Sequence, residues 1–140
     1  MHMTRPEIGI AAPCFIVRGV PAALAFYRDR LGFEITFEGP PGDIFFGIVE
    51  RGNAMIMMKA VGMDPVPNHT RDIKQGIMRW DAYLHTPDPD ALANEFATRN
   101  VEFLVPLGDN DDGLRGFEIQ DIDGYILYFG RLIHPVKARS

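Results

Sequence analysis

Hydrophobic and polar positions follow the same order twice along the chain. In the first half, the apolar run 13–17 predicts a buried strand. Gly19, Val20 and Pro21 then predict the start of a helix, because proline is well tolerated in the first helical turn. Apolar residues recur on one face of this helix until Gly32, which is typical of a left-handed helix cap.

Three strands are predicted after this helix. Residues 33–38 alternate between apolar and polar side chains, as the residues of a half-buried strand do. Residues 43–51 and 54–59 predict two further strands, separated by a turn at Gly52 and Asn53. The first half therefore predicts the element order βαβββ.

The second half repeats this order. Residues 80–85 predict a strand, Asp88 is the expected N-cap of a helix that continues through Arg99, and Asn100 takes the place of the glycine cap. Strands are then predicted at 101–105, 114–120 and 125–129. The last two flank a turn that contains an Asp-Gly pair, which is a strong hairpin signal.

The shared element order, cap and turn predict a duplicated fold. Aligning the two helices also places Gly32 on Asn100. We expect an α+β protein with a first module at 8–59, a linker at 60–78 and a second module at 79–132, together forming one domain. The linker is rich in proline and glycine, which suits an exposed crossing segment or a mobile lid.

Composition narrows the classes of partner. With 140 residues, 46% of them hydrophobic, the chain is long enough to bury a core as one compact domain. Its formal net charge of −5 argues against binding nucleic acid, which requires clustered lysine and arginine. A neutral or cationic small ligand fits this charge better.

Cysteine content and hydropathy indicate the compartment. Cys14 is the only cysteine, so an intrachain disulfide is impossible and a reducing compartment is favoured. No apolar run approaches the roughly 18 residues of a membrane-spanning helix, and residues 1–6 lack the apolar core of a signal peptide. We therefore expect a cytoplasmic protein that does not bind a membrane.

Two motifs carry a resemblance to a known family. The helix end Phe-Tyr-x3-Leu-Gly-Phe lies within 15–33, and the hairpin Asp-x-Asp-Gly-Tyr lies within 113–125. Together they resemble the vicinal oxygen chelate superfamily of glyoxalases, extradiol dioxygenases and bleomycin- or fosfomycin-resistance proteins, most closely the bleomycin-resistance members. The resemblance implies paired βαβββ modules that form a curved mixed sheet around a concave pocket. It also implies a homodimer whose pockets are shaped by both chains.

The resemblance locates the positions at which metal-dependent members hold a divalent cation. These positions correspond here to Ala12, Met57, Asp81 and Tyr128. Only Asp81 is an ordinary ligand for a hard metal, since alanine has no donor and a thioether suits soft metals. Tyrosine ligation requires deprotonation from a pKa of about 10. We therefore predict no metal and no cofactor.

Strand alternation predicts which side chains share the concave face. Tyr83 and His85 are expected to lie beside Asp81, opposite Ala82 and Leu84, whose apolar side meets the helices. The same argument, together with the resemblance, gives a set of predicted ligand-binding residues: Cys14, Met55, Met57, Asp81, Tyr83, His85, Arg115, Phe117 and Tyr128.

Several of these assignments have a structural alternative. Cys14 and the methionines are expected as buried core residues unless a ligand contacts them. Alternation leaves open whether Phe117 or Glu118 faces the ligand. Arg115 either pairs with an anionic ligand or remains an exposed surface residue. Trp80 is expected to point away from the concave face and to serve in packing.

Functions of different classes fit these residues. The first is a metal-free protein that sequesters a cationic or aromatic compound such as an antibiotic, which requires affinity and no catalytic groups. The alternative is an enzyme of the same superfamily, a lyase, isomerase or dioxygenase with a non-standard metal site, or a metal-free catalyst that uses Asp81, His85 and Tyr128. A third is an interaction module whose cup is filled by its own side chains. The sequence leaves open whether the protein is an enzyme.

Overall fold

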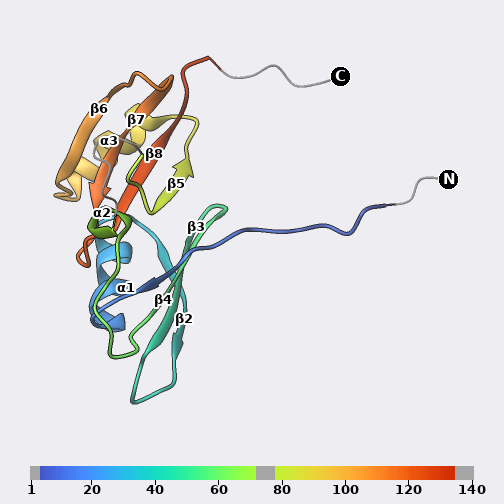
Figure 1. The fold of residues 1–140 in the computed structure, drawn as a ribbon, viewed down its shortest axis with the longest axis vertical. Helices are drawn as coiled ribbons and strands as arrows, with labels where there is room; N and C mark the ends of the chain where they lie inside the picture. The colour runs from blue at the N-terminus through green and yellow to red at the C-terminus, as the bar shows by residue number, and fades with distance from the viewer. Residues whose placement is uncertain (1–3, 72–77, 135–140) are drawn as a thin grey trace.

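A computed structural model describes residues 4–71 and 78–134 and contains two βαβββ modules (Figure 1). The first comprises β1 (Cys14–Ile16), α1 (Val20–Asp29), β2 (Glu34–Gly39), β3 (Phe46–Arg51) and β4 (Ala54–Lys59). The second comprises β5 (Ala82–His85), α3 (Pro89–Thr98), β6 (Phe103–Asp109), β7 (Leu114–Gln120) and β8 (Ile126–Leu132). A short helix, α2 (Asn68–Arg71), lies between them. The α+β duplication predicted from the sequence is confirmed.

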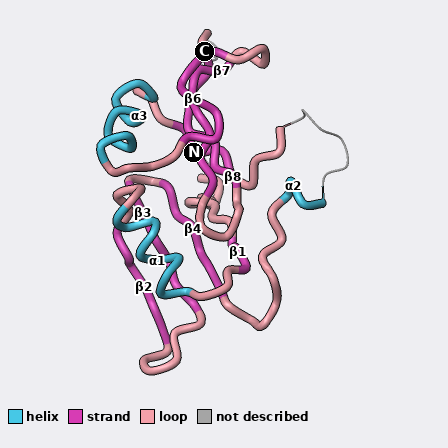
Figure 2. The backbone as a smooth tube through the Cα atoms, turned by 90° about the vertical axis from the view of Figure 1, so that its left-hand side faces the viewer, coloured by secondary structure: helices cyan, strands magenta, loops and turns pink. Residues whose placement is uncertain are grey.

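Each module has its own four-stranded mixed sheet. The strand orders are β1-β4-β3-β2 and β5-β8-β7-β6, so the two modules share one topology. In each sheet, the first strand is parallel to the last and the other pairs are antiparallel. The modules are stacked along the long axis of the molecule, with α1 and α3 one above the other (Figures 1 and 2). The mixed β-structure expected of the paired modules therefore consists of two four-stranded sheets, one in each module.

The first-turn proline, the N-cap and the left-handed caps predicted for the two helices are confirmed. Pro21 lies in the first turn of α1, and Gly32 has a φ of 70°, the left-handed conformation expected of a cap. In α3, the side chain of Asp88 accepts a hydrogen bond of 3.1 Å from the backbone N–H of Ala91. Asn100 has a φ of 61°, so it replaces the glycine at the corresponding position.

Several strand boundaries differ from the prediction, and those of β3 and β6 have a local reason. β3 begins at Phe46 because the preceding residues form a turn, in which the N–H of Phe45 donates to the carbonyl of Gly39. β6 begins at Phe103 because the N–H of Val101 is still bonded to the helical carbonyl of Phe96. It then continues to Asp109 through irregular pairing with β7.

The β7–β8 hairpin connects the second module to the first. Tyr125 stacks on Phe15 with the ring centroids 4.1 Å apart, and its hydroxyl donates to the carbonyl of Ile16 at 2.6 Å. The linker packs on the same hairpin, since the N–H of Val66 donates to that hydroxyl and His69 lies 3.0 Å from the carbonyl oxygen of Gly124. In residues 4–71 and 78–134, no helix is long and apolar enough to cross a membrane.

Candidate ligand-binding site

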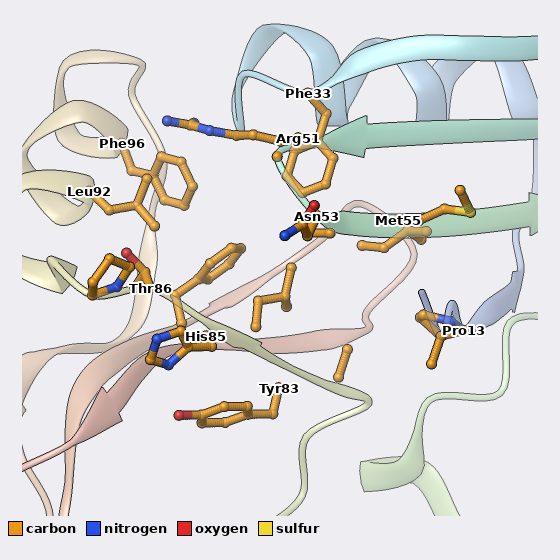
Figure 3. A pocket seen from close by; sticks show the side chains of 18 residues that line it. Pro13, Phe33, Arg51, Asn53, Met55, Tyr83, His85, Thr86, Leu92 and Phe96 are labelled. Atoms are coloured by element: carbon orange, nitrogen blue, oxygen red, sulfur yellow. The ribbon is translucent and has the colours of Figure 1, made fainter. Parts of the chain in front are cut away.

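A hollow of about 660 Å³ lies between the two modules, between β4 of the first and β5 and α3 of the second (Figure 3). This volume falls within the range of small-molecule sites, which is on the order of 300–1,000 Å³. Its apolar walls include Phe33, Met55, Ile56, Leu84, Leu92 and Phe96.

Local structure explains why these walls are apolar. Leu92 and Phe96 are one helical turn apart and present the same face of α3 to the hollow. Leu84 lies on the side of β5 that meets the helices, as alternation predicts. Phe33 and Phe96 are otherwise buried in the core, at 3% and 1% exposure, which holds the walls in place.

The polar groups of the hollow lie at its rim. They are Asn53 in the β3–β4 turn, and His85 and Thr86 at the end of β5 (Figure 3). Arg51 also lines the hollow, but its guanidinium donates to both carboxylate oxygens of Glu95. Because the guanidinium of Arg51 is paired with Glu95, the polar groups of the rim without an ion pair among the described residues are the side chains of Asn53, His85 and Thr86.

Three of the residues predicted from the sequence line the hollow, namely Met55, Tyr83 and His85. Tyr83 reaches it from β5, its hydroxyl donates to the carbonyl of Gly130 on β8 at 3.2 Å, and its ring stacks on that of Tyr128. The ring of Tyr83 is therefore shared between the hollow and the adjacent concave face of the second sheet.

Three further predicted residues lie on the concave faces. In the second sheet, Tyr128 is directly opposite both Tyr83 and Glu118. In the first sheet, Met57 is directly opposite Cys14. Cys14 is exposed rather than buried, because β1 is an edge strand and nothing in the described part of the chain covers this face.

The remaining three predicted residues are engaged elsewhere. Asp81 accepts hydrogen bonds from the backbone N–H groups of Asn68, at 2.7 Å, and Ile126, at 2.8 Å, so both of its oxygens join the linker to β8. Arg115 is paired with Asp90 of α3 and Asp109 of β6. Phe117 is fully buried among the aromatic rings of the core.

Sequence reasoning placed Trp80 on the wrong side. The ring of Trp80 lies 4.6 Å from that of Tyr128 and 5.8 Å from that of Tyr83, on the concave face. β5 begins only at Ala82, so strand alternation does not extend back to Trp80. Glu118 joins this group, with a carboxylate oxygen 3.4 Å from the indole nitrogen of Trp80. Of the two residues that alternation could not assign, Glu118 therefore lies on the concave face and Phe117 lies in the core.

Residues 9–129 match the family model described as the Glyoxalase/Bleomycin resistance protein/Dioxygenase superfamily. The chain belongs to this superfamily. A comparison with proteins of curated function gave no match.

Solved structures of superfamily proteins agree in fold. A bleomycin-binding protein from Streptomyces verticillus, complexed with copper(II)-bleomycin, is 27% identical with a TM-score of 0.65, over 90% of this chain and 97% of that one. A second bleomycin-binding protein complexed with bleomycin is 20% identical with a TM-score of 0.68, over 89% and 98%. A superfamily protein from Alicyclobacillus acidocaldarius is 14% identical with a TM-score of 0.70, over 94% and 96%.

The residues at the metal positions of the superfamily do not fit a metal centre here. Both oxygens of Asp81 already accept backbone hydrogen bonds, and Ala12 has no donor atom. Tyr128 is 3% exposed, and burial raises its pKa, which opposes the phenolate form that a metal would need. Within the described residues, no three His, Cys, Asp or Glu side chains are grouped closely enough to hold a metal ion.

The metal-free acid–base arrangement suggested by the sequence uses Asp81 to orient His85, and the described residues do not make this contact. A catalytic histidine requires a group that orients its ring. In residues 4–71 and 78–134, no hydrogen bond or ion pair joins His85 to Asp81, whose oxygens are occupied by the backbone. The site consists of an apolar hollow and an adjacent aromatic face.

Proposed function

We propose that this protein binds and sequesters a small cationic or aromatic compound, such as an antibiotic, without a metal or other cofactor. The observation that carries the proposal is the hollow of about 660 Å³, with apolar walls and a few polar groups at its rim. Binding in such a site is driven by burial of apolar ligand surface, while the rim groups orient the ligand.

Two further observations support a binding role. The bleomycin-binding protein from Streptomyces verticillus shares 27% identity over nearly the whole length of both chains. The net charge of −5 raises the local concentration of cationic ligands around the protein. Both observations concern recognition, and neither requires chemical conversion of the ligand.

The proposal includes a cytoplasmic homodimer. A chain with one cysteine suits a reducing compartment. Dimerisation is supported by the concave face of the first module, on which Phe37 is 51% exposed and Cys14 is exposed. An apolar face of this kind is commonly covered by a partner, and a second copy of the chain is the partner we propose.

Thermal-shift screening with a library of cationic, aromatic and neutral compounds tests this function. A ligand that binds the folded protein raises its melting temperature according to its concentration relative to Kd. In Met55→Trp, the larger side chain takes up part of the hollow, so we expect the shift to decrease. Met63→Trp is the matched control, because Met63 is 58% exposed and lies outside the hollow.

The library also supplies the outcome that would contradict the proposal. If no compound raises the melting temperature, or if every shift persists in Met55→Trp, the hollow is not a ligand site. Conversion of a compound by the purified protein, measured by mass spectrometry, would instead favour the catalytic alternative.

A further inference from the structure

Three aromatic rings form a continuous cluster on the concave face of the second sheet. The rings of Tyr83 and Tyr128 are nearly parallel, at 9° with centroids 5.6 Å apart, and Trp80 lies 4.6 Å from Tyr128. Tyr128 is covered at 3% exposure, whereas Tyr83 is 42% exposed. The accessible surface of the cluster is therefore offered by Trp80 and Tyr83, with Tyr128 as their support.

Two glycines hold this cluster flat against the sheet. Gly116 and Gly130 are directly opposite each other on β7 and β8. A Cβ atom on Gly116 would lie 2.7 Å from the hydroxyl oxygen of Tyr128, and one on Gly130 would lie 2.5 Å from its ring. The ring of Tyr128 thus rests directly on the backbone of both strands. The rings are fixed before any ligand arrives, which lowers the entropic cost of binding.

Glu118 brings an uncompensated negative charge to this cluster. It lies directly opposite Tyr128, and its carboxylate is half-buried beside the indole nitrogen of Trp80. Burial raises the pKa of Glu118. Glu95 and Asp90, by contrast, are each paired with arginine. Among the described residues, no basic side chain lies within 4.0 Å of Glu118.

We infer that Trp80, Tyr83 and Glu118 form a site for an organic cation with a planar aromatic part. The aromatic part stacks on the rings of Trp80 and Tyr83, and the positive charge lies beside the carboxylate of Glu118. This inference rests on the proposed binding function and narrows its ligand class from cationic or aromatic compounds to compounds that are both.

Two physical effects favour such a ligand. A cation over an aromatic face is attracted by the ring quadrupole, most strongly over tryptophan. Its charge also compensates that of Glu118, whose burial without a partner is otherwise unfavourable. An inorganic cation does not fit this site, because a hard metal ion needs several oxygen ligands and the cluster offers one carboxylate.

The experiment compares two probes that differ in charge. N-methylquinolinium carries a permanent positive charge, whereas quinoline of similar shape is neutral above its own pKa. Trp80 is the only tryptophan of the chain, so saturable quenching of its fluorescence reports binding at this cluster. Calorimetric titration of the protein with each of the two probes measures the affinities. We expect the cation to bind at least about tenfold more tightly than quinoline.

Glu118→Gln tests the role of the carboxylate. We expect this variant to lose the preference for the cation while keeping its affinity for quinoline, because the amide preserves the shape of the site without its charge. Glu102→Gln is the matched control, since it removes the same charge from an exposed position in the second module. It should keep the preference. The melting temperature of each variant verifies that it is folded.

Three outcomes would overturn the inference: equal affinity for the two probes, an unchanged preference in Glu118→Gln, or no saturable binding of N-methylquinolinium. The proposed function fails differently, when no library compound stabilises the protein. A compound whose stabilising effect is reduced in Met55→Trp, together with equal affinity of the protein for the two probes, would retain the binding function and remove the cation site.

Discussion

Arg51 and Glu95 join the two modules through a bidentate ion pair. Two guanidinium nitrogens of Arg51, in the turn region of the first module, each lie 2.8 Å from a carboxylate oxygen of Glu95 on α3 of the second. Arg51 also donates to the carbonyl of Leu31, which follows α1. One side chain thus connects three segments at the edge of the hollow.

Replacing Glu95 with glutamine should weaken this connection. The Arg51 guanidinium holds the pKa of Glu95 below its usual value, so the folded state favours the ionised carboxylate. Since the pair is about one-third exposed, we expect Glu95→Gln to lower the free energy of unfolding by about 1 kcal/mol at neutral pH. Chemical denaturation measures this difference.

The pH dependence of the same variant has a defined sign. A lowered folded-state pKa gives stability that is present above the unfolded pKa of about 4.3 and is lost as pH falls through the folded value. The gap between wild type and Glu95→Gln should therefore close in acid. Asp29→Asn is the control, because its pair with Arg28 is exposed and lies within one module. An equal loss in both variants would show that Glu95 has no special role between the modules.

In a second contact between the modules, the helix belongs to the first module and the hairpin to the second. Tyr27 on α1 of the first module donates its hydroxyl to Asp121, in the β7–β8 turn of the second, at 2.7 Å. The other oxygen of Asp121 accepts from the backbone N–H groups of Asp123 and Tyr125. Each module therefore presents a hairpin side chain to the helix of the other, as a duplicated fold allows.

Asp121 makes stability depend on pH in the direction opposite to that of Glu95, because its pKa is raised in the folded state. Burial raises the pKa of Asp121 to about 6, and the nearby charge of Asp123 adds to this effect. A raised folded-state pKa for a carboxyl means that stability falls as pH rises from the unfolded pKa to the folded one, by about 2–3 kcal/mol. In Asp121→Asn this fall should disappear, because the amide does not titrate.

Denaturation of both proteins across the acidic to neutral range provides the measurement. Asp111→Asn, at an exposed position in the loop after β6, should keep the pH dependence of the wild type. If stability falls with rising pH by the same amount in Asp121→Asn as in the wild type, another group causes the pH dependence.

The sequence predicts the repeated element order because short-range signals determine where each helix and turn begins and ends. Proline in the first helical turn, the caps Gly32 and Asn100, and the Asp-Gly turn each act within a few residues. Strand alternation likewise predicts that Tyr83 and Tyr128 share a face, because the side chains of neighbouring strands remain in register.

The hollow could not be predicted in this way. Phe33 and Phe96 belong to different modules and meet only because the modules are stacked. Alternation does not predict the position of Trp80, because this residue lies outside β5. Strand alternation likewise does not predict that Asp81 accepts a hydrogen bond from the backbone of Asn68, because the position of Asn68 depends on the path of the linker. Contacts set by tertiary arrangement leave no periodic signal in a single sequence.

Adding a side chain at Gly116 should damage both the fold and the aromatic cluster. A Cβ atom there would overlap the carbonyl oxygen of Phe129 and approach the hydroxyl of Tyr128. We expect Gly116→Ala to lower the free energy of unfolding by about 2–3 kcal/mol and to change the fluorescence of Trp80. Gly108→Ala is the control, because Gly108 pairs with Gly116 but a Cβ atom there has space. Equal effects at both glycines would contradict this account.

Dimerisation can be tested at the concave face of the first module. Phe37, Ile48, Met57 and Cys14 are directly opposite one another along one row across its four strands. Phe37 is 51% exposed and also packs beside Phe46, with centroids 5.9 Å apart. If a second copy covers this row, the protein sediments as a dimer. Phe37→Lys should then shift it to the monomer, because burying an unpaired ammonium group is unfavourable.

Analytical ultracentrifugation over a range of concentrations makes this comparison. Val61→Lys is the matched control, since Val61 is 47% exposed in the linker, away from the row. It should remain a dimer. A wild-type monomer at every concentration would remove the second copy from the proposal. A dimer that persists in Phe37→Lys would instead place the interface on another face.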